Sequence, residues 1–94
     1  MTTNRELLEL AAKAAGKDID PHRYDPDDGF AIRHTAIFWN PIADDGDALR
    51  LAVKLGIPVG VFANYASIAN DSDHFAATRR AIVRAAAEIG KEMK

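Results

Sequence analysis

The chain has 94 residues, of which 48% are apolar and 28% charged, and its formal net charge is −2. This size fits one domain, residues 1–94, and the composition is that of a globular protein and excludes the disordered class. A slightly acidic chain has no general attraction for phosphate backbones or anionic lipid, so nucleic acid is not the default partner. The absence of cysteine excludes disulfides and Cys-ligated metal sites.

The N-terminal residues Met1–Glu9 lack the basic segment and apolar core of a signal peptide. No apolar run approaches the length of about 18 residues that a membrane-spanning helix requires. We therefore expect a soluble, cytoplasmic protein without a membrane partner.

The first predicted element is a helix over Thr3–Gly16. Thr3 is suited to cap its N-terminus, and Glu6 follows three residues later, as in a capping box. Gly16 is suited to end the helix in the left-handed conformation. The stripe expected to face the core consists of Leu7, Leu10, Ala11 and Ala14.

The following segment, Lys17–Gly29, is polar and is interrupted by Pro21 and Pro26. Proline, aspartate and glycine favour turn conformations. We therefore predict a loop here, with a turn at Asp25–Gly29.

Residues Phe30–Trp39 are rich in aromatic and β-branched side chains, which favours a strand. We predict one strand, kinked near His34. Because side chains alternate along a strand, Ile37 and Trp39 should share one face and Phe38 should take the other. Trp39 is expected to pack into the core, and the alternative is an exposed anchor for a partner protein.

The segment Trp39–Gly56 combines an aromatic residue, a proline turn, an acidic cap and an amphipathic helix. Pro41 fixes its own φ and pushes Asn40 toward an extended conformation, so the chain turns before the helix begins. Aspartates in a first turn accept hydrogen bonds from its free N–H groups and favour the positive end of the helix dipole. We assign structural roles, and no catalytic role, to Trp39, Asn40, Pro41, Asp44, Asp45, Gly46, Asp47 and Gly56.

This second helix is apolar on more than one face. One stripe consists of Ala48, Leu51, Ala52 and Leu55. A further stripe, formed by Leu49 and Val53, lies beside it, while Arg50 and Lys54 mark the solvent side. We expect the helix to pack against a sheet on one side and against another helix, or a second subunit, on the other.

Two more elements complete the chain. We predict a strand over Ile57–Tyr65, with Pro58 at its start, where a missing N–H is tolerated. A third helix should open at Asn70–Asp73 and continue from His74 to about Met93, and its alanines should permit close approach of a neighbouring helix. The stripe expected to face the core is Phe75, Thr78, Ile82, Ala85, Ile89 and Met93.

This order of elements predicts an α/β (α+β) fold, a small layered helix/sheet/helix sandwich with three helices and a narrow sheet. A narrow sheet leaves strand edges that need a cover. A homodimer is the simplest cover and agrees with a second helix that is apolar on two sides.

The stretch W-N-P, a short Asp/Gly run and A-L-R-L-A-V-K-L-G, residues 39–56, resembles the signature of a small family of bacteriophage-encoded proteins, the phage ABA sandwich domain. The run at Ala76–Gly90 also resembles the end of that family, whereas Ile42 and Ala43 stand where Leu and Thr are common. The match covers about a third of the chain. It implies helix, sheet and helix layers, a phage genome as the source and hence the host cytoplasm, and it brings no reaction, ligand or catalytic residue.

The acidic runs Asp25–Asp28 and Asp44–Asp47 are the candidate ligands for a hard cation such as Ca²⁺ or Mg²⁺. Neither run has the ligand spacing or the bidentate glutamate of a calcium loop, and turn and cap roles account for both. The histidines, which could join a zinc site only through tertiary folding, are His22, His34 and His74. We predict no metal site and no cofactor, and a divalent-metal-dependent enzyme using Asp44–Asp47 is the third hypothesis.

Arg79, Arg80 and Arg84 form the one concentrated positive feature of the sequence. Arg80 and Arg84 stand one turn apart on one helix face, where they could contact phosphates. A solvated face that balances the acidic loops is the favoured interpretation. A nucleic-acid-binding regulator that uses these arginines is the second hypothesis.

The first hypothesis is a non-enzymatic accessory or interaction protein of a bacteriophage or prophage. We expect it to be a homodimer, with an unidentified phage or host protein as its further partner. No arrangement of acid, base and nucleophile in the sequence favours an enzyme over this hypothesis.

Overall fold

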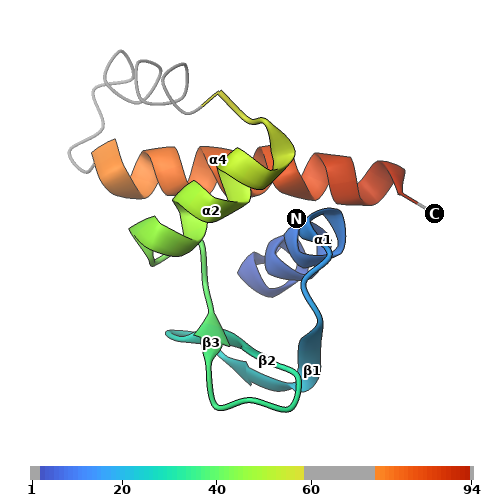
Figure 1. The fold of residues 1–94 in the computed structure, drawn as a ribbon. Coiled ribbons are helices and arrows are strands. Elements are labelled where there is room, and N and C mark those ends of the chain that lie inside the picture. Colours follow the sequence, from blue (N-terminus) through green and yellow to red (C-terminus); the bar gives the residue numbers. More distant parts are fainter. Residues whose placement is uncertain (1–2, 59–73, 94) are drawn as a thin grey trace.

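The computed structural model describes residues 3–58 and 74–93 (Figure 1). This part of the chain contains three helices and a three-stranded antiparallel sheet, which confirms the predicted α+β class. The elements in chain order are α1 (Asn4–Ala15), β1 (Ile19–Asp25), β2 (Gly29–Ile32), β3 (Phe38–Trp39), α2 (Asp45–Leu55) and α4 (His74–Glu92).

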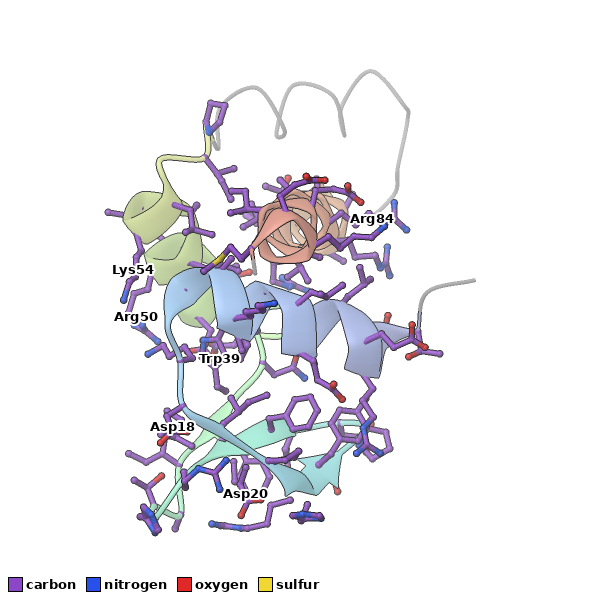
Figure 2. All side chains as sticks on the ribbon, turned by 90° about the vertical axis from the view of Figure 1, so that its right-hand side faces the viewer. Asp18, Asp20, Trp39, Arg50, Lys54 and Arg84 are labelled. Atoms are coloured by element: carbon purple, nitrogen blue, oxygen red, sulfur yellow. The ribbon has the colours of Figure 1, made fainter. Side chains whose placement is uncertain are left out.

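The elements form layers. The sheet, with strand order β1-β2-β3, lies at one side, α1 lies between the sheet and α4, and α2 packs beside α4 (Figure 1 and Figure 2). The largest fully buried side chains include Leu8 of α1, Phe30 of β2 and Val83 of α4. Each layer therefore contributes to one shared core. None of the helices in residues 3–58 and 74–93 has the length and apolarity needed to cross a membrane.

Helix α1 has the predicted caps. The Thr3 side chain accepts a hydrogen bond from the Glu6 N–H at 3.1 Å, and Gly16 closes the helix in the left-handed region with φ 69°. The predicted core stripe is displaced by one residue, because the buried positions are Leu8, Ala11, Ala12 and Ala15. The helix is enclosed by the sheet on one side and by α4 on the other, so its buried arc is wider than one stripe.

Strand β1 corrects the predicted loop at Lys17–Gly29. The strand pairs with β2, with Tyr24 opposite Phe30, and the predicted Asp25–Gly29 turn joins the two strands. Pro21 is tolerated because β1 is an edge strand. Arg5 connects α1 to this strand, because its Nη2 donates to the Pro21 carbonyl at 3.0 Å. Cross-strand pairing and tertiary contact, rather than local propensity, produce this strand.

The predicted single strand at Phe30–Trp39 is also wrong, because the chain reverses and forms the hairpin of β2 and β3. His34 has φ 66°, and the Ile32 N–H donates to the Ile37 carbonyl across the turn at 2.8 Å. The predicted kink near His34 is therefore a turn at which the chain reverses direction. Trp39 is buried and Phe38 is exposed, as alternation predicts, whereas Ile37 lies in the turn and is 64% exposed.

Helix α2 has the predicted caps and the predicted buried stripe, but the expected packing against the sheet is wrong, because α2 packs against α4 and α1. Asp44 caps it, and Gly56 ends it with φ 68°. Ala48, Leu51 and Ala52 are buried, so the first apolar stripe faces the core. The second stripe is exposed, as the 55% and 72% exposed fractions of Leu49 and Val53 show.

Helix α4 lies where the sequence predicts it, but a different face is buried. Of the predicted stripe only Ile82 is buried, and Phe75 is 73% exposed. The face that packs inward consists of Ile82, Val83, Ala86, Ala87 and Gly90. Its small side chains allow α1 to approach so closely that a Cβ at Gly90 would lie only 2.1 Å from the Leu10 carbonyl oxygen. Close helix packing on the alanine face therefore outweighs burial of the larger side chains.

Two predictions fall wholly or largely outside the described residues. Of the strand predicted at Ile57–Tyr65, only Ile57 and Pro58 are described, and neither is in a strand. The predicted opening of the third helix at Asn70–Asp73 lies outside them altogether.

Candidate functional site

Asn40 is the centre of the distinctive Trp39–Gly56 segment. It is a buried polar residue, 8% exposed, and all of its hydrogen-bonding groups have partners. Its backbone N–H donates to Asp47 Oδ2 at 3.0 Å, and its Nδ2 donates to the Asp27 carbonyl at 3.0 Å. Its Oδ1 accepts from the Ile42 N–H at 3.1 Å. The Asn40 side chain thus joins the β1–β2 turn to its own turn, and its backbone N–H connects both to the start of α2.

The three aspartates of this segment are each bound within the protein. Asp44 Oδ2 accepts from the Asp47 N–H at 2.8 Å, so of the three candidate aspartates Asp44 is the cap. Asp47 Oδ1 accepts from Arg50 Nη2 at 2.7 Å, and Asp45 Oδ1 accepts from Arg79 Nη1 at 2.6 Å. The carboxylates therefore diverge toward different partners, whereas a cation site requires oxygens that converge.

Packing explains the apolar residues of the segment. Trp39 is 3% exposed and belongs to the core cluster, which confirms the expected core position. Pro41 is among the largest fully buried side chains. Opposite them, Gly29 has φ 86°, and a Cβ on it would lie 2.3 Å from the Trp39 carbonyl oxygen. Gly46 is less constrained, since its nearest neighbours would be 3.2 Å or more from a Cβ.

Of the three candidate arginines, Arg79 serves the fold. Its Nε donates to the Ile42 carbonyl at 2.7 Å, and its side chain is only 17% exposed. Together with the Asp45 ion pair, this contact ties α4 to the turn before α2. Arg80 and Arg84 are exposed on α4, and Figure 2 shows Arg84. The structure thus separates Arg79, which the sequence grouped with the other two, from the exposed pair.

The residues bound in this way form a structural joint, which we define as Asn40, Ile42, Asp45, Asp47 and Arg79. Neither His22, exposed on β1, nor His34, exposed in the β2–β3 turn, takes part in it, and His74 is the first residue of α4. Within residues 3–58 and 74–93, no group of three or more His, Asp or Glu residues is arranged to hold a metal ion.

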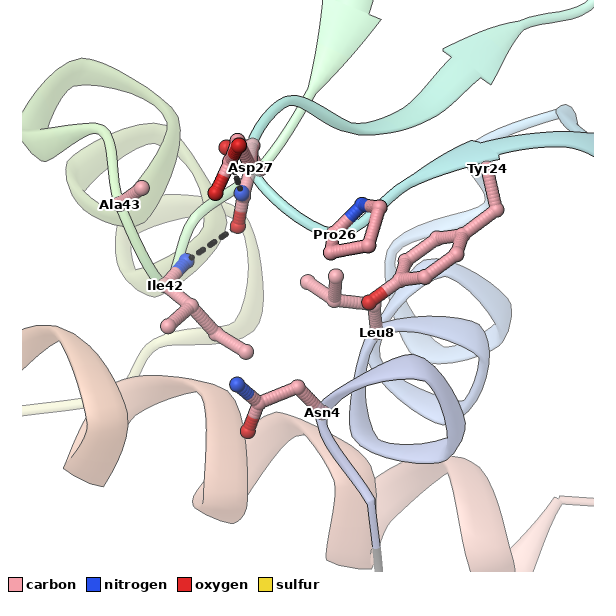
Figure 3. Close-up of a pocket in the computed structure, with 8 residues that line it drawn as sticks. Asn4, Leu8, Tyr24, Pro26, Asp27, Ile42 and Ala43 are labelled. Atoms are coloured by element: carbon pink, nitrogen blue, oxygen red, sulfur yellow. Dashed lines mark hydrogen bonds between the residues drawn. The ribbon is translucent and has the colours of Figure 1, made fainter.

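A small cavity adjoins the joint (Figure 3). Its volume is about 160 Å³, and Asn4 and Tyr24 face it from α1 and β1, while the Asn40–Asp27 hydrogen bond lies at its border. Pockets for organic ligands usually enclose about 300–1,000 Å³. This cavity therefore suits a few water molecules better than an organic ligand.

A second cavity, of about 230 Å³, lies between the C-terminal ends of α1 and α2. We call it the cationic cavity, and its lining residues are Ala15, Lys17, Trp39, Arg50, Leu51 and Lys54. Sequence reasoning missed it because Arg50 and Lys54 are typical of a solvated helix face, and Lys17 lies more than 30 residues before them. Only the packing of α1 beside α2 brings the three cations around one space.

Comparison with known proteins adds no relative: no family model matches the chain, and neither a curated protein nor a solved structure gives a significant match. The function must therefore be argued from the geometry.

Proposed function

We propose that the protein is a non-enzymatic interaction protein that acts as a homodimer, of the kind that bacteriophages and prophages encode. The observation that carries this proposal is the exposed second stripe of α2. Leu49 and Val53 are 55% and 72% exposed on a helix whose other face is buried in the core. Leu49 and Val53 stand one turn apart and form an apolar stripe on the exposed face of the helix, a feature that suits a protein–protein contact. The phage or prophage origin rests on the sequence resemblance of residues 39–56 and 76–90.

The charge pattern of α2 favours a second copy of the chain as the occupant. The acidic residues Asp44, Asp45 and Asp47 lie at its N-terminal end, and the basic residues Arg50 and Lys54 lie in its C-terminal half. Two copies that pair antiparallel across a two-fold axis place the acidic end of each helix beside the basic half of the other. The two helix dipoles also oppose one another in that arrangement.

The sheet edges are less suited to the contact. Strand β1 carries Pro21 and charged side chains at its exposed edge, and β3 has only two residues. Short strands, proline and charge are the features by which proteins prevent edge-to-edge pairing. The dimer contact that the sequence suggested for the sheet is therefore better placed on α2.

The test is the mass in solution, measured by light scattering at concentrations well above micromolar. We expect twice the 10.2 kDa mass of the chain. Val53→Asp should give the monomer mass, because it buries an unpaired carboxylate in the contact. Ile37→Asp, the same kind of change at a 64% exposed site on the other side of the molecule, should leave the dimer intact. A monomer mass for the unaltered protein would contradict the proposal.

The second candidate is a nucleic-acid-binding regulator, which the exposure of Arg80 and Arg84 favours. It predicts retention on heparin that falls as salt rises. Arg80→Glu and Arg84→Glu should each reduce retention more than the control Arg23→Glu, which makes the same change of charge on β1. Equal retention of all three variants would remove this candidate.

A further inference from the structure

The cationic cavity gathers three positively charged side chains from two helix ends. Lys17 follows the cap of α1, and Arg50 and Lys54 lie one turn apart on α2. The Lys54 ammonium crosses toward α1, since its Nζ lies 3.9 Å from the place that a Cβ would take at Gly16. Figure 2 shows Arg50 and Lys54 on the side of the molecule opposite Arg84, with Trp39 close to them. The cavity is therefore distinct from the arginines of α4.

Part of this charge has no partner. Arg50 is paired with Asp47 at 2.7 Å, whereas neither Lys17 nor Lys54 forms an ion pair with any residue in the described ranges 3–58 and 74–93. The neighbouring Asp18 is bound to Arg33 Nε at 2.9 Å, and this hydrogen bond, with the charge of Asp18, raises the pKa of Arg33. Two positive charges at the cavity thus have no carboxylate partner in the part of the chain that the structure describes.

The helix ends offset this charge only in part. A helix C-terminus carries a partial charge of about −0.5. At the end of α1, however, the carbonyl groups already accept hydrogen bonds from the backbone N–H groups of Gly16 and Lys17. At the end of α2, Gly56 and Ile57 donate in the same way. The positive charge of Lys17 and Lys54 therefore exceeds the partial negative charge that the two helix ends offer.

The remaining lining of the cavity is apolar. Ala15, Trp39 and Leu51 are buried core residues that form its inner wall. A volume of about 230 Å³ equals the liquid volume of about eight water molecules, at ~30 Å³ each. The cavity is smaller than the about 300–1,000 Å³ of most organic-ligand pockets, so it suits an oxyanion that carries one small apolar group against its apolar side, and no larger ligand.

We propose that the cationic cavity binds a phosphomonoester carried by a small organic molecule. A phosphomonoester has a charge of about −1.5 to −2 near neutral pH, which matches the two unpaired lysines, whereas a carboxylate supplies only one negative charge. Lys17 and Lys54 bind the phosphate oxygens as point charges, and the free N–H groups of Arg50 add hydrogen bonds. The organic part of the ligand contacts the wall formed by Trp39 and Leu51.

Calorimetric titration of the whole 94-residue protein at low salt tests the proposal, with phenyl phosphate, inorganic phosphate and benzoate as probes. We expect phenyl phosphate to bind most tightly, inorganic phosphate more weakly because it leaves the apolar wall bare, and benzoate most weakly because it has a single charge. Binding of phenyl phosphate should weaken as salt rises. If phenyl phosphate does not bind, or binds no better than benzoate, the proposal is wrong.

Single charge removals locate the site. Lys17→Gln and Lys54→Gln should each weaken phenyl phosphate binding by at least about fivefold, the loss of one charge-assisted contact at a partly exposed site. Lys91→Gln removes the same charge from an exposed position on α4 and should have no effect. An equal affinity of all three variants would place binding outside the cavity. Arg50 and Lys54 also belong to the charge pattern that favours the dimer, whereas Lys17 lies outside α2. The mass of each sample is therefore measured alongside, and weaker phenyl phosphate binding by Lys17→Gln at an unchanged mass separates this proposal from the dimer.

Discussion

The structural joint and the cationic cavity lie at opposite ends of α2 and use their polar groups in opposite ways. In the joint, the backbone N–H, Nδ2 and Oδ1 of Asn40 each have a hydrogen-bond partner, and the Arg79 guanidinium binds both the Ile42 carbonyl and Asp45. In the cavity, Lys17 and Lys54 lack ion-pair partners within the described ranges. Satisfied polar groups hold a fold together, and charges without partners are available to a ligand. The comparison predicts that substitutions in the joint reduce stability, whereas substitutions in the cavity reduce binding.

The largest expected effect is that of Gly29→Ala, next to the joint. The new Cβ would lie 2.3 Å from the Trp39 carbonyl oxygen, at a residue with φ 86°. Backbone strain and overpacking together should lower the free energy of unfolding by about 4 kcal/mol. Urea unfolding measures this loss. Gly56→Ala is the matched control, because φ is 68° but no atom lies within 4 Å, and it should cost only about 1 kcal/mol. Equal losses would show that the close approach to Trp39 is not needed.

Asn40→Ala should have the next largest effect. It leaves the Asp27 carbonyl and the Ile42 N–H without their partners, at about 1–3 kcal/mol for each group that remains buried. We expect a loss of about 3 kcal/mol in the free energy of unfolding. Asn4→Ala, on the exposed first turn of α1, should cost less than about 0.5 kcal/mol. A similar small loss for Asn40→Ala would mean that the joint does not depend on its central side chain.

The adjacent arginines of α4 provide a third comparison. Arg79→Gln removes the ion pair with Asp45 and a hydrogen bond to the Ile42 carbonyl, so it should lower stability by about 1–2 kcal/mol. Arg80→Gln, one residue further on an exposed site, should change stability by less than about 0.5 kcal/mol. Thermal unfolding resolves such a difference, since 1 kcal/mol shifts the Tm of a domain of this size by about 4–8 °C. The reverse order would contradict the separation of Arg79 from its neighbours.

The smallest effect is expected in the cavity. Lys17→Gln removes an exposed ammonium group that makes no ion pair within residues 3–58 and 74–93, so stability should change by less than about 0.5 kcal/mol. The same unfolding measurements test this expectation. A loss as large as that of Arg79→Gln would mean that Lys17 holds the fold together, as the joint does.

The parts of the fold that were predicted from the sequence are those that local chemistry decides. Thr3 and Asp44 cap their helices, and Gly16 and Gly56 end them, because each satisfies groups within one turn of itself. The strand β1 was not predictable in this way. Its residues are polar and include Pro21, and it exists through pairing with β2 and through the contact with Arg5.

The candidate site shows the same division. Asp44 and Asp47 bind partners within seven residues, so local sequence reasoning could reach their structural roles. The side chain of Asn40 also binds the Asp27 carbonyl, 13 residues away, and this contact could not be predicted locally. Arg79 finds its partners 34 and 37 residues away, so nothing near it in the sequence distinguishes it from Arg80. Likewise, the face of α4 that is buried depends on how closely α1 can approach Gly90. The spacing of apolar residues along α4 gives no information on that approach.

The sequence by itself determined the helices, their caps and the α+β class, because hydrogen bonds within a turn and the spacing of apolar residues act over a few positions. Tertiary structure alone decided the β1–β2 pairing, the reversal at His34, the structural joint and the cationic cavity. Each of these depends on groups that are distant in the chain and meet only when α1, α2 and α4 pack around Phe30 and Trp39. The free energy of that packing selects among conformations that local preferences leave open.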